Sequence, residues 1–214
     1  MLTISSKNYS SWSLRGWLLC KLAGLAIREQ AVSIDDPANR AELLLLAPSN
    51  LVPRLSHDGA SVWDTLAIAE YLAELYPDAG MLPQDRLARA HCRSVSGEMH
   101  SGFYNLRSAL PMNIKARHAN FKVFAGAQPD IDRVQAIWHE CLHRWGGPFL
   151  FGRRATIADA MFAPVCTRFL TYGVPMTDAA RAYCATIMAW PPVVEWVAAA
   201  KQEPDELEEL DMEF

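Results

Sequence analysis

A dense break at residues 76–83 divides the chain into two parts with different hydrophobic patterns, and it limits the folds that the chain can adopt. The sequence there reads YPDAGMLP, and two prolines and a glycine this close together cannot continue a helix. Before the break, strand-like and helix-like segments alternate; after it, long helical patterns take over. We therefore predict an α/β domain at residues 1–77, a linker at residues 78–84 and an all-α domain at residues 85–214.

The first domain is predicted to have the element order βαβαββα. Alternating or short apolar runs predict extended segments at residues 1–4, 29–34, 52–55 and 61–63. Apolar residues at helical spacing predict helices at residues 10–23, 39–47 and 64–76. Asp58-Gly59 predicts a hairpin turn between the last two strands, because glycine accepts the positive φ that such turns need.

The composition excludes several classes of protein. About half of the 214 residues are apolar, and a net charge of −4 with 21% charged residues provides no basic field for nucleic acid or an anionic membrane. No apolar run approaches about 18 residues, so no transmembrane helix is expected. The N-terminus lacks the pattern of a secretory signal. We expect a cytoplasmic protein that binds neither nucleic acid nor membrane.

The cysteines and the acidic residues are distributed unevenly. Five cysteines, widely spaced and without a C-x-x-C pair, indicate free thiols in a reducing compartment and neither a disulfide framework nor a zinc knuckle. Residues 201–214 hold seven of the 24 acidic residues and one of the 20 basic residues. We interpret this segment as a solvated acidic tail.

One short motif suggests a zinc hydrolase. Residues 139–143 read HECLH, and on a helix His139 and His143 would point the same way and chelate one Zn²⁺, with Glu140 as general base. Such a site needs a third protein ligand, and no histidine follows His143. The alternative is a helix that carries two half-exposed imidazoles.

Three further motifs, together with the element order, point to a known family. Residues 50–55 read NLVPRL, residues 63–72 read WDTLAIAEYL and residues 156–160 read TIADA. Over nearly the whole chain this pattern resembles the cytosolic glutathione transferase superfamily. The first motif is similar to its turn into a cis-proline, the second to its Glu-Ser-x-Ala-Ile-x-x-Tyr-Leu helix start, and the third to the capping box of its central helix. The resemblance implies a thioredoxin-like N-terminal domain, an all-α C-terminal domain and a homodimer.

The same resemblance implies a binding site for glutathione as co-substrate and no metal. The backbone at Val52 and Pro53 would pair with the cysteinyl part of the peptide. Thr65 would bind the γ-glutamyl carboxylate at a helix N-terminus while Asp64 faces the ammonium group. Arg40, on the expected second helix, would reach the glycyl carboxylate. The alternative is that Asp64 and Thr65 only cap a helix.

Residues 8–15, NYSSWSLR, resemble the Ser-Ser-Cys-Ser-Trp-Arg signature of the zeta-class enzymes. Glutathione chemistry needs a thiolate near neutral pH, and a hydroxyl donor at a helix N-terminus favours the anion through its hydrogen bond and the helix dipole. The alignment makes Ser10 the first candidate for this role and Ser11 the second. Tyr9 is the alternative if the loop is arranged as in the tyrosine-type classes.

Trp12 stands where the zeta signature has its cysteine. We therefore expect addition of the glutathione thiolate to a small hydrophobic electrophile rather than isomerisation of maleylacetoacetate. The electrophile would lie between the domains, with Trp12, Phe103, Tyr104 and Met112 as lining. A non-catalytic member of the family that binds a protein partner or a hydrophobic ligand is the alternative function. Since the family has no metal at the position of HECLH, we interpret that motif as a coincidence.

Overall fold

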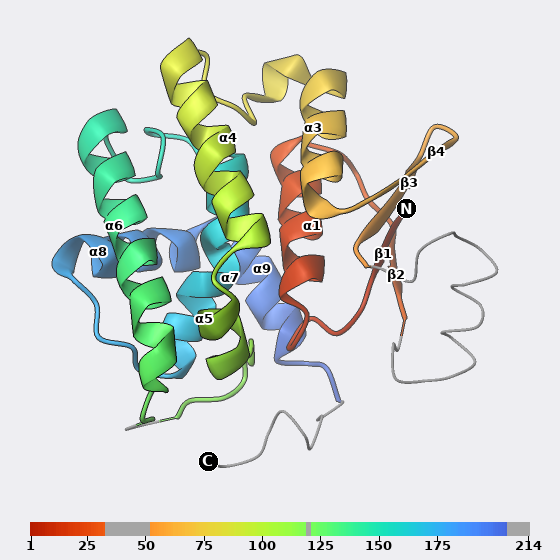
Figure 1. The fold of residues 1–214 in the computed structure, drawn as a ribbon. Helices are drawn as coiled ribbons and strands as arrows, with labels where there is room; N and C mark the ends of the chain where they lie inside the picture. Colours follow the sequence, from red (N-terminus) through yellow and green to blue (C-terminus); the bar gives the residue numbers. More distant parts are fainter. Residues whose placement is uncertain (33–51, 119–120, 205–214) are drawn as a thin grey trace.

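The computed structural model describes residues 1–32, 52–118 and 121–204, which form a small sheet with helices on one side and a larger bundle of helices (Figure 1). The strands are β1 (Leu2–Ile4), β2 (Glu29–Ala31), β3 (Arg54–His57) and β4 (Ala60–Trp63). The helices are α1 (Ser11–Leu22), α3 (Thr65–Leu75), α4 (Arg86–Ser101), α5 (Tyr104–Ala109), α6 (Gln128–Trp145), α7 (Ile157–Thr171), α8 (Asp178–Ala189) and α9 (Pro191–Ala200). The helix expected at residues 39–47 lies outside the described residues.

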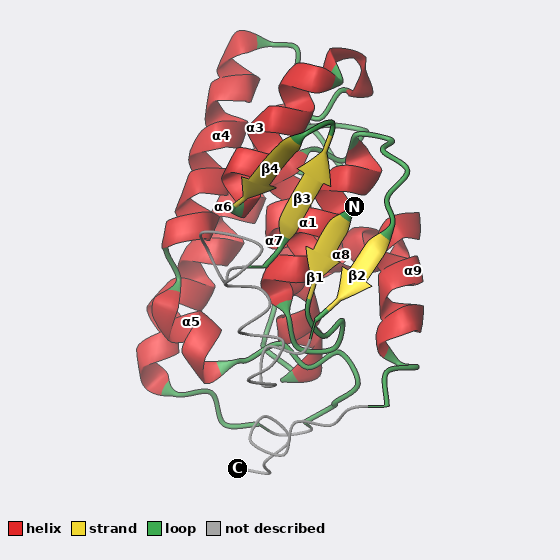
Figure 2. Cartoon of the chain, turned by 90° about the vertical axis from the view of Figure 1, so that its right-hand side faces the viewer, coloured by secondary structure: helices red, strands yellow, loops and turns green. Residues whose placement is uncertain are grey.

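The sheet has the strand order β2-β1-β3-β4. β1 pairs in parallel with β2, with Leu2 opposite Glu29, and antiparallel with β3, with Leu2 opposite Leu55. The hairpin between β3 and β4 turns at Asp58 and Gly59, whose φ values are 48° and 81°, which confirms the predicted turn. Figure 2 shows the four strands in front of α1 and α3, with the helical domain behind them. The predicted α/β domain and all-α domain are confirmed as the fold class.

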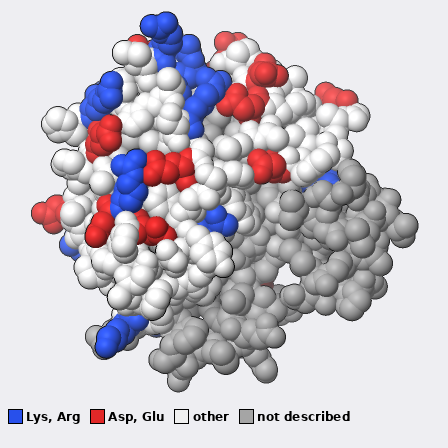
Figure 3. Space-filling view, in the orientation of Figure 1, with Lys and Arg blue, Asp and Glu red and all other residues white. Residues whose placement is uncertain are grey.

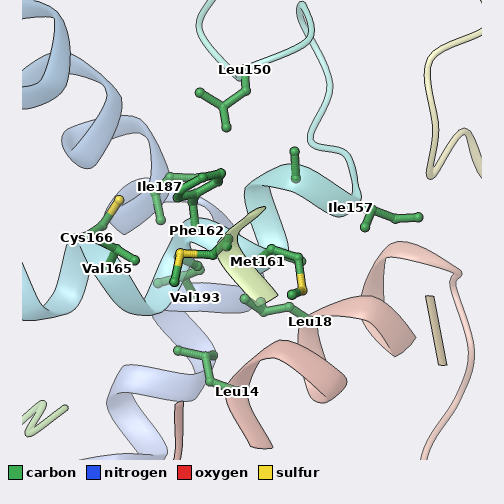
Figure 4. Close-up of a cluster of buried hydrophobic side chains, with 14 of the residues drawn as sticks. Leu14, Leu18, Leu150, Ile157, Met161, Phe162, Val165, Cys166, Ile187 and Val193 are labelled. Carbon is green, nitrogen blue, oxygen red and sulfur yellow. The ribbon is translucent and has the colours of Figure 1, made fainter. Parts of the chain in front are cut away.

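Helix α1 makes the most extensive contact between the two domains. It contacts α3 on the sheet side and α7 of the helical domain. Leu14 and Leu18 of α1 are completely buried, and they face a cluster that includes Met161, Phe162 and Val165 of α7 (Figure 4). Removal of this apolar surface from water is the main stabilising contribution at the domain boundary. The start of α1 is thereby held at the junction between the domains.

Helix α7 lies at the centre of the helical domain, and every residue of it except Leu170 is buried. The predicted capping box at its start is confirmed: the Asp159 carboxylate accepts from the Thr156 N–H at 2.8 Å and from the Thr156 hydroxyl at 3.0 Å. The other oxygen of Asp159 accepts from the Leu150 N–H at 3.0 Å and from the Tyr183 hydroxyl at 3.1 Å. Burial raises the pKa of Asp159, and these four donors oppose that shift.

The surface of the described residues carries no dominant charge of one sign on the face shown in Figure 3, where basic side chains lie among acidic ones. Two exposed pairs on α4 and its neighbours illustrate this: Arg93 with Glu70 at 3.0 Å, and Arg133 with Glu98 at 2.6 Å. Within residues 1–32, 52–118 and 121–204, no helix is long and apolar enough to cross a membrane.

We predict that Asp159→Ala strongly destabilises the protein. The substitution leaves two backbone N–H groups and the hydroxyls of Thr156 and Tyr183 without their buried acceptor. The free energy of unfolding should fall by roughly 3–5 kcal/mol, because each buried donor left unpaired costs about 1–3 kcal/mol. Urea denaturation followed by circular dichroism measures this change. The exposed Asp178, in the first turn of α8, is the control: Asp178→Ala should cost less than about 1 kcal/mol, and equal losses for both variants would contradict the prediction.

Candidate active site

Ser10 forms the N-cap of α1, and its side chain is half-buried. Its Oγ accepts from the Ser13 N–H at 3.2 Å and donates its own proton to Ser13 Oγ at 2.9 Å. The first turn of a helix presents free N–H groups and the positive end of the helix dipole. A hydroxyl in this position can donate a hydrogen bond to an anion that the dipole also favours.

Ser11 follows Ser10 in sequence but lies in a different environment. Its side chain is buried, and its Oγ accepts from Arg15 Nη1 at 3.4 Å and from Arg168 Nη2 at 3.2 Å. The Ser11 hydroxyl therefore points toward the interior between α1 and α7. Tyr9 is half-buried, and its backbone N–H donates to Ser6 Oγ at 3.2 Å.

The Val52–Pro53 peptide bond is cis, as the resemblance implied. Pro53 is buried at the start of β3 and packs against Gly16 in α1. A Cβ at Gly16 would lie 2.5 Å from Pro53 Cγ, so only glycine allows this approach. The contact places the backbone before β3 directly beside the first half of α1.

Asp64 and Thr65 lie together at the start of α3. Asp64 is the N-cap, with φ 72°, and its Oδ1 accepts from the N–H groups of Leu66 at 2.8 Å and Ala67 at 3.3 Å. His100, at the end of α4, contacts both: its Nε2 lies 3.1 Å from Asp64 Oδ2, and its Nδ1 lies 3.3 Å from Thr65 Oγ1. Because a carboxylate only accepts, Nε2–H donates to Asp64 and, in the neutral ring, Nδ1 accepts from the Thr65 hydroxyl.

Trp12 connects the start of α1 to His100. The two rings meet edge to face, with their centroids 5.3 Å apart. The guanidinium carbons of Arg15 and Arg107 lie 4.5 Å and 4.7 Å from the centroid of the Trp12 ring. Cations over an indole face are attracted by its quadrupole. Trp12 thus joins α1, the end of α4 and α5 in one contact cluster.

Arg15, Arg107 and Arg168 form a cluster of three guanidinium groups around Ser11 and Trp12. Burial lowers the pKa of Arg15 well below its usual value, with further lowering by the neighbouring Arg168 and Arg107, and it lowers the pKa of Arg168 to about 10. Two buried nitrogens, Arg15 Nη2 and Arg168 Nε, have no hydrogen-bond partner among the described residues. Within the same residues, none of the three pairs with a carboxylate. Buried cations without counter-ions are costly, so the cluster favours an anion nearby.

The five cysteines are all buried and unpaired, and all lie within the described residues. Burial raises the pKa of the Cys20 thiol to about 12, that of Cys92 to about 11 and that of Cys141 to about 12. It raises that of Cys166 as well, where the neighbouring Cys184 adds to the shift. None of them lies at the start of α1, so the hydroxyls there are the candidates for thiol activation.

The HECLH motif lies on the exposed side of α6. His139, Glu140 and His143 are all exposed, and the two imidazole rings are stacked with their centroids 6.1 Å apart. Glu140 lies 3.6 Å from His91 rather than beside a metal-ligand set. In the described part of the chain, no group of three or more potential ligands comes together. The described structure therefore supplies no third ligand for the zinc alternative.

The structure brings together some of the residues that the sequence predicted for the site. Ser10, Ser11 and Trp12 at the start of α1 are connected through His100 to Asp64 and Thr65, while Arg40 lies outside the described residues. Of the expected lining residues, Phe103 and Met112 are buried in the core, whereas Tyr104 is 77% exposed.

Three side chains of this cluster have no role in the sequence-based predictions: His100, Arg107 and Arg168. No local pattern marks them, since each meets its partners through packing of the helical domain. Arg15 lies inside the serine motif, but nothing in that motif indicates its contacts with Ser11 and Trp12.

The fold and these contacts define a class: a thioredoxin-like domain with a cis-proline before β3, joined to an all-α domain that contacts the start of α1. Residues 9–75 match the N-terminal domain of glutathione S-transferase, and residues 119–199 match its C-terminal domain. The chain belongs to the glutathione S-transferase family.

Individual relatives agree with this assignment. The chain is 31% identical over 193 residues to a maleylacetoacetate isomerase of Rhizobium meliloti, covering 84% of each chain. A glutathione transferase homologue from Burkholderia gl BGR1, solved with bound glutathione, is similar in structure with a TM-score of 0.69 and 25% identity, over 94% of this chain and 96% of that one. A bacterial zeta-class maleyl pyruvate isomerase has a TM-score of 0.72 with 21% identity, over 96% and 99% of the two chains, which supports the fold.

We predict that the cysteines of the native protein react slowly with Ellman's reagent at pH 8. Raised thiol pKa values keep the thiolate fraction low, and burial blocks access to the sulfur atoms. Fewer than one thiol per chain should react within minutes, whereas the unfolded protein in guanidinium chloride, as the control, should show all five. A single fast-reacting thiol in the native protein would contradict the described burial.

Proposed function

We propose that the protein is a glutathione transferase in which Ser10 stabilises the thiolate of bound glutathione. The observation that carries the proposal is the position of the Ser10 hydroxyl at the N-terminus of α1, half-buried and already accepting from the Ser13 N–H. Rotation of this hydroxyl about its C–O bond turns its proton from Ser13 Oγ to a thiolate, while the accepted hydrogen bond is kept. The helix dipole adds to the stabilisation of the anion.

The remaining contacts with glutathione are proposed from the family pattern and the arrangement at α3. The backbone at Val52, before the cis-proline Pro53, would pair with the cysteinyl part. Thr65, through its hydroxyl and its N–H at the start of α3, would bind the γ-glutamyl carboxylate, and Asp64 would bind its ammonium group. Arg40 would bind the glycyl carboxylate. The Burkholderia homologue with bound glutathione supports this co-substrate.

The electrophile has two candidate classes. A small hydrophobic electrophile is the prediction from the serine motif with Trp12 in place of the cysteine. A carboxylate-bearing electrophile is favoured by the guanidinium groups of Arg15, Arg107 and Arg168, none of which has a carboxylate partner within the described residues. The Rhizobium relative is named for maleylacetoacetate, a dicarboxylic acid, which supports an isomerase as the second candidate function. We also propose that the active form is a homodimer, as in the family pattern.

We predict that Ser10→Ala raises the thiol pKa of bound glutathione by about 1–2 units, because a charge-assisted hydrogen bond is worth about 1.5–3 kcal/mol. The ultraviolet absorbance of the thiolate, followed as a function of pH, measures this pKa. Ser11→Ala and Tyr9→Phe are the matched controls and should leave it nearly unchanged. If Ser10→Ala has no effect and one of the controls does, the activating hydroxyl belongs to that residue instead.

We predict that Arg107→Gln distinguishes the two classes of electrophile. Arg107 is half-buried beside Trp12, so its guanidinium is the most accessible of the three. If the substrate carries a carboxylate, kcat/KM for such compounds should fall at least about tenfold, as expected for loss of a partner in a buried charge pair, while that for a neutral chloronitroarene stays within about twofold. The control is Arg133→Gln, at the exposed pair with Glu98. Unchanged kcat/KM for both compounds would favour the hydrophobic class, and equal losses for both would indicate a structural role of Arg107.

A further inference from the structure

Glu203, beyond the end of α9, is bonded to the loop that precedes α1. Its Oε1 accepts from the Lys7 N–H at 2.6 Å, and its Oε2 accepts from the Asn8 N–H at 3.0 Å and from the Ser6 hydroxyl at 2.7 Å. Three donors from consecutive residues therefore converge on one half-buried carboxylate. The prediction of a solvated acidic tail is wrong for this residue, because its charge is used inside the fold.

Ser6 connects this carboxylate to the candidate activating serine. While its hydroxyl donates to Glu203, its Oγ accepts from the N–H groups of Asn8 at 3.1 Å and Tyr9 at 3.2 Å. Its carbonyl oxygen accepts from the Ser10 N–H at 3.0 Å. The position of Ser10 therefore depends on the conformation of Ser6. The Glu203 carboxylate fixes that conformation through its hydrogen bond with the Ser6 hydroxyl.

The segment that carries Glu203 is itself fixed. Its N–H donates to the Ala200 carbonyl at 3.2 Å, which continues the end of α9, and its carbonyl oxygen accepts from the Lys115 ammonium. Trp196 of α9 donates from Nε1 to the Lys7 carbonyl at 2.9 Å. Figure 1 shows the end of α9 running alongside the loop between β1 and α1. The loop is thus held against the end of α9.

We propose that Glu203 is a positioning residue for thiol activation: its carboxylate orders residues 6–8 and, through Ser6, sets the place of the Ser10 hydroxyl. This inference rests on the proposed role of Ser10. Glu203 itself contacts none of the described residues proposed to bind the peptide moiety of glutathione, Val52, Pro53, Asp64 and Thr65. It therefore affects the thiolate and leaves the binding of the peptide moiety largely unchanged.

The chemistry of the side chain explains why a carboxylate is required. All three groups that meet Glu203 are donors, and an ionised carboxylate accepts at both oxygens. An amide offers one acceptor and one NH₂ group, which would face an N–H or O–H donor of the loop. Glu203→Gln therefore keeps the size of the side chain but loses at least one of the three hydrogen bonds.

The test compares Glu203→Gln with Ser10→Ala, the double variant and the wild type. Amide hydrogen exchange should show that Lys7 and Asn8 exchange about tenfold faster in Glu203→Gln, as expected for loss of a charge-assisted hydrogen bond. The thiol pKa of bound glutathione should rise by about 1 unit, while the calorimetric Kd for glutathione stays within about twofold. In the double variant the thiol pKa should equal that of Ser10→Ala alone, because both changes act on one group.

Glu195→Gln is the matched control, since Glu195 also joins α9 to α1, through Lys21 at 2.9 Å, but does not touch the loop. It should change neither the exchange of the loop amides nor the thiol pKa. Thermal unfolding of each variant distinguishes loss of the fold from displacement of the Ser10 hydroxyl. If Glu203→Gln does not fold, Ser6→Ala replaces it, because that substitution interrupts the same connection.

Two results would overturn the inference in distinguishable ways. If Ser10→Ala raises the thiol pKa and Glu203→Gln does not, Glu203 has no positioning role and the proposed function stands. If Ser10→Ala itself leaves the thiol pKa unchanged, the proposed role of Ser10 fails and the inference fails with it.

Discussion

The burial of every residue of α7 except Leu170 is the constraint on which the rest of the structure depends. A helix that is enclosed on nearly all sides cannot satisfy most of its polar groups with water, so most of them find partners inside the protein. At its start, Asp159 collects four donors; near its end, Arg168 donates to the carbonyl oxygens of Arg107 and Leu110 and to Ser11 Oγ. The polar contacts of one central helix therefore set the positions of α5 and of the first turn of α1.

The start of α1 is where segments distant in the sequence meet. The sheet side contributes the cis-proline turn, which approaches α1 at Gly16, and the helical domain contributes His100 and Arg168. The carboxylate of Glu203 and the buried amide of Asn8, which donates to Asn113 at 2.9 Å, hold the loop before Ser10 from two sides. A hydroxyl that must meet a thiolate in a fixed geometry benefits from such a support, because preorganised donors need no rearrangement when charge develops.

Positive charge is concentrated around the start of α1, although the chain as a whole is acidic. Three arginines lie around Trp12 and Ser11, and within the described residues none of them pairs with a carboxylate. Arginine is suited to such a location because its guanidinium is weakly hydrated and stacks on an indole. The arrangement combines an aromatic surface with a positive field.

Local sequence was sufficient for the features whose physical cause is local. The break at residues 76–83, the Asp58-Gly59 turn, the cap at Asp64 and the capping box at Thr156 each follow from the conformational preferences of a few adjacent residues, and the structure contains all of them. Only the tertiary structure decided that Arg168 would reach Ser11, 157 positions away, and that Glu203 would bind the loop at Ser6, 197 positions away. Such contacts depend on how whole helices pack around α7, and no pattern of neighbouring residues encodes that packing.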